Sequence, residues 1–380
     1  MNLWRPIRAV LVCLLLWSIA LCFSGCRPVR PFRPATDAGL GRAFEPEDQV
    51  ASGLIEVAAS ERLWTGIAVS RDGRIFVCFP RWSDDVKTSV GEVVEFGRVR
   101  PFPNTAWNHW GASASPGDHF ICVQSVYIDK EDNLWVLDPA SPYLGGVVSG
   151  GAKLVKVDIE DGKVLQRIVF DERVAPPESY LNDVRVDTGR KVAYISDSGL
   201  GALVVVDLET GRARRLLADH PSTKSEDIVL TIAGKKWLPG GATPQVHVDG
   251  LALTGDGEFL YYHSLTGRTL YRIETRWLRD ATFGDYTHGT KVESLYETCA
   301  ADGMAIGPDG YLYLTAIEDN AIKLFVSLGK LETVVKAPEL KWPDSIAFGP
   351  DGDMYVTTSQ IHLGDSAIEP YKIFRIGLKN

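Results

Sequence analysis

The sequence predicts an all-β protein, a six-bladed β-propeller preceded by a signal peptide and a short proline-rich tether. One phrase, in which an alternating apolar strand is followed by a turn and a second strand, occurs six times. A third strand follows the copies, and no long segment has the period of a helix. Antiparallel units that recur at intervals of about 40 to almost 70 residues are typical of propellers with four strands per blade.

Residues 1–25 have the composition of a secretory signal peptide. Arg5 and Arg8 precede an apolar run of about fifteen residues, shorter than the roughly twenty that a membrane span needs. The small pair Ser24-Gly25 before Cys26 resembles the lipobox of bacterial lipoproteins. Cys26 is therefore the expected lipidation site, although an ordinary signal or an uncleaved anchor stays open.

Residues 26–49 are rich in proline and are expected to form a flexible tether. With the lipid on Cys26, the protein would lie in the cell envelope, anchored on the periplasmic side of a membrane, or it would be secreted. The membrane contact would be made through the lipid anchor only.

Residues 50–380 are expected to form the propeller as one domain. The last copy ends with its third strand at 371–377, and no fourth strand follows it. Residues 53–59 can supply this fourth strand, which would close the ring between the two ends of the domain. The segment "RWLRDAT", residues 276–282, indicates a short helical insertion. A closed ring exposes no long sheet edge, so we expect a monomer.

Asp-Gly pairs occur at two places within a copy. The pair Asp309-Gly310 stands between two apolar runs, where a hairpin turn needs a residue with positive φ. The pair Asp302-Gly303 stands before the first strand, where no turn is required. This earlier position is polar in every copy, and its members are Thr65, Gln124, Asn182, Asp249, Asp302 and Asp344.

These six residues interrupt otherwise apolar strand faces. Because the first strand of a blade borders the central channel, copies in register would place all six in a ring at one mouth. The second strand returns toward this mouth, which brings His263 near the ring. The predicted ligand-binding residues are therefore Asn182, Asp344, Gln124, Thr65 and His263.

Convergent carboxylates require a stabilising partner. Two like charges about 4 Å apart repel by roughly 4 kcal/mol at an effective dielectric constant near 20. A divalent cation, Ca²⁺ first, would suit the all-oxygen donors Asp249, Asp302 and Asn182, and Asp249 and Asp302 are also the candidate catalytic residues. The alternatives are an organic ammonium ligand in the channel, or structural capping of backbone N–H groups.

The remaining composition limits the partners. A formal charge of −9 without a basic patch gives no sign of nucleic-acid binding. Cys78, Cys122 and Cys299 allow one disulfide, whose pairing the sequence does not decide.

The segments "GIAVSRDGRIFVCFPRW", "SVYIDKEDNLWVLD", "AYISDSGLGALVVVDLETG" and "DGMAIGPDGYLYLT" resemble the yellow/major royal jelly protein family. This family is related to the gluconolactonase-like and regucalcin-type six-bladed propellers, and the resemblance spans most of residues 50–380. The resemblance to the lactonases implies a divalent metal at Asp302 and Asp249 and a substrate-side Asn182. Thr65 stands where the lactonases have Glu, so metal binding is implied more strongly than lactone hydrolysis.

Members of the yellow type include proteins similar to isomerases of quinones, binders of biogenic amines and nutritive proteins. The resulting hypothesis is that the propeller binds or isomerises a small molecule at the channel mouth. The alternatives are a metal-dependent lactonase-like hydrolase, and a protein-interaction platform without catalysis.

Overall fold

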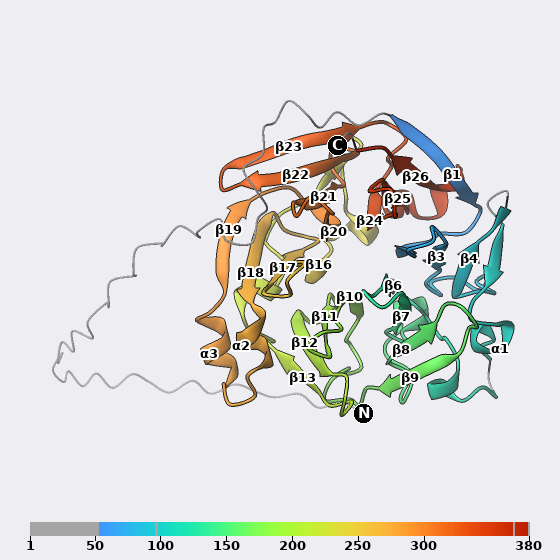
Figure 1. Ribbon diagram of the computed structural model, residues 1–380. Helices are drawn as coiled ribbons and strands as arrows, with labels where there is room; N and C mark the ends of the chain where they lie inside the picture. Colours follow the sequence, from blue (N-terminus) through green and yellow to red (C-terminus); the bar gives the residue numbers. More distant parts are fainter. Residues whose placement is uncertain (1–52, 96–97, 112, 368, 379–380) are drawn as a thin grey trace, which may run out of the picture. The chain divides into compact units, whose positions relative to one another are not determined.

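The computed structural model describes residues 53–95, 98–111, 113–367 and 369–378. Six four-stranded antiparallel sheets follow one another around a central channel (Figure 1), which confirms the six-bladed propeller. The predicted signal peptide, Cys26 and the tether lie outside the described residues. Within the described part of the chain, no helix is both long enough and apolar enough to cross a bilayer.

The first three blades are each built from consecutive strands, ordered from the channel outward. Blade 1 contains β2 (Ile67–Val69), β3 (Ile75–Cys78), β4 (Val90–Val93) and β5 (Val99–Pro101). Blade 2 contains β6 (Ser125–Ile128), β7 (Asn133–Asp138), β8 (Lys153–Asp158) and β9 (Val164–Val169). Blade 3 contains β10 (Leu181–Asp187), β11 (Val192–Asp197), β12 (Ala202–Asp207) and β13 (Ala213–Leu216).

The other three blades follow the same plan, except that the last one takes its outer strand from the other end of the domain. Blade 4 contains β16 (Val248–Leu253), β17 (Phe259–Ser264), β18 (Thr269–Glu274) and β19 (Glu293–Glu297). Blade 5 contains β20 (Ala301–Ile306), β21 (Leu312–Ala316), β22 (Ala321–Ser327) and β23 (Lys330–Lys336). Blade 6 contains β24 (Pro343–Phe348), β25 (Met354–Thr358), β26 (Tyr371–Ile376) and β1 (Leu54–Ser60).

Strand β1 closes the ring. It pairs antiparallel with β26, from Leu54 opposite Ile376 to Ser60 opposite Tyr371. The prediction that the N-terminal segment completes the last blade is therefore correct. Because this strand is separated from β26 by almost the whole domain, its pairing joins the two ends of the fold.

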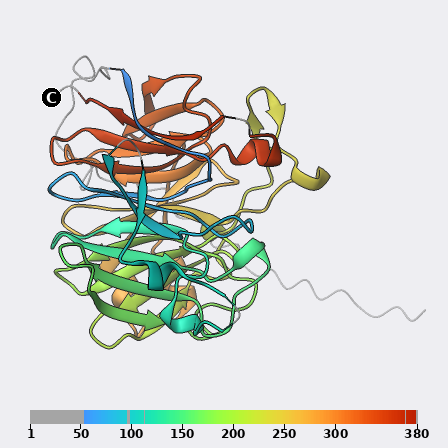
Figure 2. The same cartoon turned by 90° about the vertical axis from the view of Figure 1, so that its right-hand side faces the viewer.

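Short helices and one hairpin lie in the segments that connect the strands of the propeller. The helices are α1 (Thr105–Asn108), α2 (Thr275–Arg279), α3 (Asp285–Gly289), η3 (Pro116–Asp118), η4 (Pro142–Leu144), η5 (Pro221–Thr223), η6 (Pro239–Gly241) and η7 (Ile361–Ser366). Helix α2 overlaps the predicted helical insertion at residues 276–279 and begins one residue before it. The hairpin of β14 (Thr231–Ile232) and β15 (Lys235–Lys236) projects from the same side of the propeller as η7 (Figure 2).

The turns between the first two strands of a blade use the Asp-Gly pairs in the predicted way. Gly310 has φ of +85°, and its N–H donates to the carbonyl of Gly307. Asp309 does not have positive φ, and its carboxylate instead accepts the backbone N–H of Tyr311. The glycine alone therefore supplies the left-handed residue of the turn.

The core lies between neighbouring blades. Aromatic and branched side chains from adjacent sheets form separate buried clusters, such as the one shared by Tyr313 on β21 and Val356 on β25. A fully buried ion pair links Lys153 Nζ to Asp138 Oδ2 at 2.8 Å, and Asp138 also accepts the backbone N–H groups of Ile121 and Cys122. Such acidic residues at the ends of the second strands hold the loops that surround the channel mouth.

The three cysteines of the propeller are free and buried. Burial raises the pKa of the Cys78, Cys122 and Cys299 thiols to about 12. The disulfide that the composition allowed is therefore not formed among the described residues, and the cysteines act as small apolar core residues.

Candidate functional site

The polar positions before the inner strands coincide with β-bulges in blades 3 to 6. The register between the first two strands shifts between Leu181 and Val184, and the same shift recurs at Val248 and Leu251. Blades 5 and 6 have it at Ala301/Met304 and Pro343/Ile346. A bulge releases two residues from the ladder and re-aims their side chains, which is how these polar groups leave the apolar row.

Hydroxyl groups on the second strand accept backbone N–H groups freed by the bulges of blades 3, 5 and 6. Ser196 Oγ accepts the N–H of Asp183 in blade 3, and Thr315 Oγ1 accepts the N–H of Gly303 at 2.9 Å in blade 5. In blade 4 the equivalent place opposite the bulge belongs to His263. His263 is fully buried there and approaches Thr298 Oγ1 at 3.4 Å.

The glycine of the Asp302-Gly303 pair is required because the next blade approaches closely. A Cβ at Gly303 would collide with the backbone carbonyl of Asp344. Gly250 has the same relation to blade 5, where its Cβ would lie 2.7 Å from the carbonyl oxygen of Asp302. In the pair Asp302-Gly303, the acid is therefore directed at the channel, and the glycine leaves space for the backbone of the neighbouring bulge.

A cavity of about 520 Å³ lies at this mouth of the channel. Five of the six predicted ring residues line it: Gln124, Asn182, Asp249, Asp302 and Asp344. Aromatic side chains form much of its wall, namely Trp82, Tyr180, Trp237 and Trp342. The site therefore combines buried carboxyl groups with a largely aromatic enclosure, the pattern expected of a small-molecule pocket.

Two of the predicted ligand-binding residues do not line this cavity. Thr65 is buried, and its hydroxyl donates to the carbonyl of Gln124 at 2.8 Å. His263 has no exposed surface and sits behind the bulge of blade 4. Thr65 therefore supports the backbone of the ring, whereas the His263 ring contacts the side chain of Thr298.

Hydrogen bonds link ring residues to one another and to the wall. Asn182 Nδ2 donates to Asp249 Oδ2 at 2.9 Å and to Ser198 Oγ at 3.0 Å. Gln124 Oε1 accepts the hydroxyl of Tyr180 at 2.8 Å. Tyr180 in turn accepts the indole N–H of Trp82, so the wall and the ring are one connected network.

A second aromatic group surrounds Asp302. Trp342 is fully buried and donates its Nε1–H to Asp302 Oδ2. Trp237 meets Trp342 edge-to-face, with ring centroids 4.9 Å apart, and His362 stacks on its other side at 5.8 Å. This packing fixes the orientation of the indole and therefore of the acid that it holds.

The three ring acids are strongly perturbed. Asp249, Asp302 and Asp344 are 2%, 8% and 3% exposed. Burial raises the pKa of Asp302 to about 7, although the Trp342 hydrogen bond opposes the shift. Burial, and then the charge of Asp302, raise the pKa of Asp249 and of Asp344 well above the usual range for aspartate. Burial therefore favours the protonated form of all three carboxyl groups relative to ordinary aspartates.

The next acid along the channel is differently placed. Asp183 forms an ion pair with Arg185, at 2.6 Å, and also accepts the backbone N–H of Leu251. The same guanidinium reaches the carbonyl of Met304 on blade 5 at 2.8 Å. Asp183 and Arg185 line a smaller cavity of about 170 Å³, so the available cation neutralises this acid and not the ring.

No three His, Cys, Asp or Glu side chains of the described residues come close enough together to bind a metal ion. Of the predicted ligands Asp249, Asp302 and Asn182, the last directs its amide N–H toward Asp249. The carboxylate and amide oxygens of the ring are donors of the kind that a hard cation such as Ca²⁺ prefers.

Sequence reasoning missed the aromatic wall and Asp183. Trp82, Trp237 and Trp342 come from loops outside the repeated phrase, and nothing in their spacing places them at the ring. Asp183 directly follows Asn182, and only the bulge brings both residues to the channel. The aromatic residue before the repeat, as in Trp342 ahead of Asp344, is the one signal that the sequence offered.

Comparison with known proteins agrees with the fold and identifies relatives. The chain is 23% identical over 269 residues to major royal jelly protein 5 of Apis mellifera, covering 66% of this chain and 42% of that protein. It is 22% identical over 192 residues to dopaminechrome tautomerase of Drosophila melanogaster, covering 44% and 39%. The chain spans about half the length of these and the other curated relatives that it matches.

Solved structures with the same architecture include a gluconolactonase from Xanthomonas campestris, with a TM-score of 0.52 and 14% identity over 92% of this chain and 99% of that one. A calcium-binding regucalcin from Agrobacterium tumefaciens has a TM-score of 0.51 and 14% identity over 86% and 95%. These likenesses establish the six-bladed propeller. A family profile described as major royal jelly protein matches residues 121–362, more than half of the chain. The chain therefore belongs to the major royal jelly protein family.

Proposed function

We propose that the protein binds a small, planar, unsaturated molecule in the aromatic cavity and isomerises it by proton transfer. The observation that carries this proposal is that three buried carboxyl groups meet in a cavity of about 520 Å³ whose wall includes three tryptophan side chains. This volume lies within the range of roughly 300–1,000 Å³ that small-molecule sites occupy.

Asp302 is the proposed acid–base residue. Its pKa of about 7 lets it accept a proton at neutral pH, and a general base is most effective when its pKa is near the working pH. Asp249 and Asp344 have pKa values well above those of ordinary aspartates, so they are available as proton donors. Loss of a proton from one substrate atom and its return to another conserves atoms and electrons, and the reaction needs no cofactor.

The aromatic wall provides the proposed binding surface. Trp82 and Tyr180 lie on one part of it, with ring centroids 6.5 Å apart, and Trp342 with Trp237 lies on another. A flat conjugated ring can stack on such side chains while its polar atoms reach the carboxyl groups. The dielectric inside this enclosure is low, which strengthens hydrogen bonds to a charge that develops during the reaction.

The similarity to a dopaminechrome tautomerase supplies a first substrate to assay. The experiment measures the decay of dopaminechrome with wild-type protein, with Asp302→Asn and with Asp161→Asn, whose carboxylate lies in an exposed turn. Loss of one acid–base group should lower the turnover number by about a hundredfold or more, while ligand binding is retained. Equal turnover by the wild type and Asp302→Asn would contradict the role of this residue.

A divalent cation and lactone hydrolysis stay predictions. The cation is favoured by one orphaned atom, since Asp344 Oδ2 is buried without a hydrogen-bond partner among the described residues. Thermal melting in EDTA and then in Ca²⁺ tests it, because a ligand at a hundred times its Kd stabilises a protein by about 2.7 kcal/mol. A stabilisation that disappears in Asp302→Ala would assign a cation site and direct the search to lactones. An unchanged Tm would exclude this cation.

We also propose that the mature protein is anchored at Cys26 in the cell envelope. The proposal rests on the signal-like composition of residues 1–25 and on the small pair before the cysteine. Metabolic labelling with a radioactive fatty acid should mark the wild type but not Cys26→Ser. Label retained by the variant would refute this attachment site.

A further inference from the structure

A second concave region lies outside the channel, along the outer part of blade 3. This groove has a volume of about 940 Å³ and is lined by β13, by the turn between β10 and β11, and by residues at the end of α2. Seven basic and only three acidic side chains line it, although the whole chain carries a formal charge of −9. The groove is therefore a local concentration of positive charge on an acidic protein.

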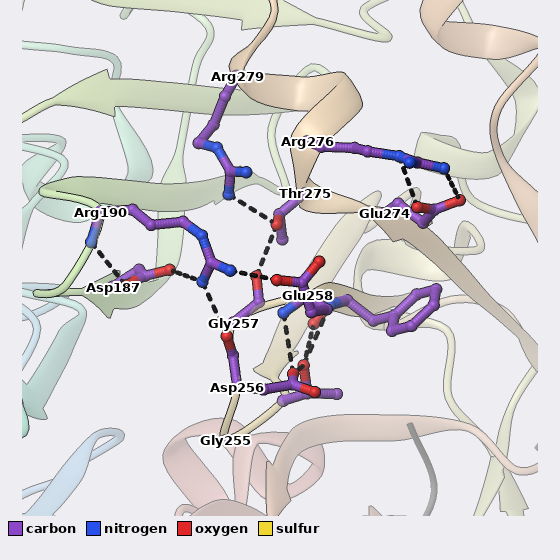
Figure 3. Close-up of polar contacts among 12 residues, drawn as sticks. Asp187, Arg190, Gly255, Asp256, Gly257, Glu258, Glu274, Thr275, Arg276 and Arg279 are labelled. Carbon is purple, nitrogen blue, oxygen red and sulfur yellow. Dashed lines mark hydrogen bonds and ion pairs between the residues drawn. The ribbon is translucent and has the colours of Figure 1, made fainter. Parts of the chain in front are cut away.

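Four of the seven basic groups have a carboxylate partner. Arg215 is paired with Asp197 at 2.6 Å, and Lys191 with Glu209. The same holds for Arg173 with Asp171. Arg190 is held between Asp187 and Glu258, as Figure 3 shows. These pairs neutralise part of the positive charge and define the edges of the groove.

The other three guanidinium groups, on Arg212, Arg214 and Arg279, have no carboxylate partner among the described residues. Arg214 donates to the carbonyls of Leu278 and Arg279, which fixes its position at the end of α2. Arg279 donates from Nη1 to Thr275 Oγ1 at 2.9 Å (Figure 3) and forms no ion pair with a carboxylate of the described residues. Arg212 is exposed, and its side chain makes no hydrogen bond within the described part of the chain.

Three planar donor groups beside one groove match a multivalent oxyanion. A guanidinium presents parallel N–H groups that bind two oxygens of a phosphate at once, and a phosphate carries more charge than a single carboxylate. We propose that this groove binds a phosphate group through the guanidinium groups of Arg212 and Arg279. Arg214 lies beside them and is held in place by its hydrogen bonds to the carbonyls of Leu278 and Arg279. The ligand is either a free phosphorylated compound or a phospholipid headgroup, because both present the same oxygens.

Arg276 is a matched control on the same helix. It is paired with Glu274, at 2.7 Å, and does not line the groove, whereas Arg279 does (Figure 3). The experiment therefore compares the wild type, Arg276→Gln, Arg212→Gln and the double variant Arg212→Gln/Arg279→Gln. Because Arg212 is exposed and has no side-chain partner in the described residues, its single variant keeps the test valid if the double variant folds poorly.

Two probes distinguish the sources of phosphate. Calorimetry with inorganic pyrophosphate measures binding of a free ligand, and sedimentation with phosphatidylcholine vesicles, with and without phosphatidic acid, measures binding to a headgroup. We expect the wild type and Arg276→Gln to bind at least one probe equally, and the double variant to bind it about tenfold or more weakly. Weakening by added salt should accompany the binding.

Pyrophosphate binding alone would assign a free phosphorylated ligand, and a response to phosphatidic acid alone would assign a lipid headgroup. Affinity that is the same in all four proteins, or no binding of either probe, would overturn the proposal. Neither outcome bears on the channel, since Arg212 and Arg279 do not line the aromatic cavity.

Discussion

Trp342 donates its indole N–H to Asp302 Oδ2, so one side chain forms both the aromatic wall of the cavity and the hydrogen bond to its central acid. A hydrogen bond to the ionised form of a carboxyl group favours that form. This bond opposes the effect of burial, which is the main cause of the raised pKa of Asp302. The hydrogen bond from Trp342 therefore helps to hold the pKa of Asp302 near neutral pH.

Replacement of Trp342 by Phe should raise the pKa of Asp302 above its value of about 7, because the opposing hydrogen bond is lost while burial remains. Infrared difference spectroscopy of the carboxyl C=O stretch, recorded across a pH series, measures the midpoint. Trp237→Phe is the control, since Trp237 packs edge-to-face on Trp342 without contacting Asp302 through a hydrogen bond. An equal midpoint in both variants would show that the indole N–H has no part in the shift.

Asp302→Asn should make the stability of the protein less dependent on pH between about pH 4 and pH 7. Because burial raises the pKa of Asp302 to about 7 in the folded state, the folded protein binds more protons than the unfolded chain above about pH 4. The free energy of unfolding therefore falls as the pH rises toward 7, by at most about 1.4 kcal/mol per pH unit for one group. Asp302→Asn has no titrating carboxyl group at this position, so its free energy of unfolding does not fall for this reason.

The measurement is Tm as a function of pH for the wild type, Asp302→Asn and Asp161→Asn. The stability of Asp302→Asn relative to the wild type should increase from about pH 5 to about pH 8, whereas the exposed-turn variant should follow the wild type. Parallel curves for all three proteins would mean that Asp302 titrates normally in the fold.

Lys153→Met should destabilise the protein by about 3–5 kcal/mol, because it leaves the fully buried Asp138 without its counter-charge. Urea unfolding measures the change. Lys341→Met provides the comparison, since Lys341 pairs with the exposed Glu369 and such surface pairs contribute at most about 1 kcal/mol. A similar small effect of both substitutions would argue against a charged, buried pair.

A chain that begins at residue 61 should lose cooperative thermal unfolding, whereas one that begins at residue 53 should keep it. The shorter chain lacks β1, so β26 becomes an open edge and the buried Ala58 no longer covers the outer part of blade 6. Calorimetry of both chains tests the difference. Equal transitions would show that pairing of the ends is dispensable.

The candidate site could be predicted in part. The ring position of Asp302 followed from a polar residue at the same place in six copies, because repeated units in register bring equivalent residues to one axis. Gln124, Asn182, Asp249 and Asp344 reach the cavity for the same reason. Thr65 and His263 do not line the cavity, because Thr65 donates to the carbonyl of Gln124 and His263 is fully buried against Thr298.

Bulges accompany the ring positions of Asn182, Asp249, Asp302 and Asp344, whereas Gln124 reaches the cavity from a blade whose first two strands pair without a register shift. Blades 3 to 6 insert extra residues at the ring, whereas β2 pairs with β3 without a register shift. Alternation with period two predicts which face a side chain takes only while the ladder is regular. A bulge changes that rule within one residue, so the adjacent Asn182 and Asp183 both reach the channel.

The sequence by itself determined the class of fold, the number of blades, the closing strand and the polar character of the channel mouth, because each depends on local alternation and on repetition. Only the tertiary structure decided which side chains surround the acids and how strongly their pKa values shift. Trp342 and Asp302 are 40 residues apart in the chain and in contact in the fold. Desolvation is the property of an assembled cavity, and no local pattern of residues records it.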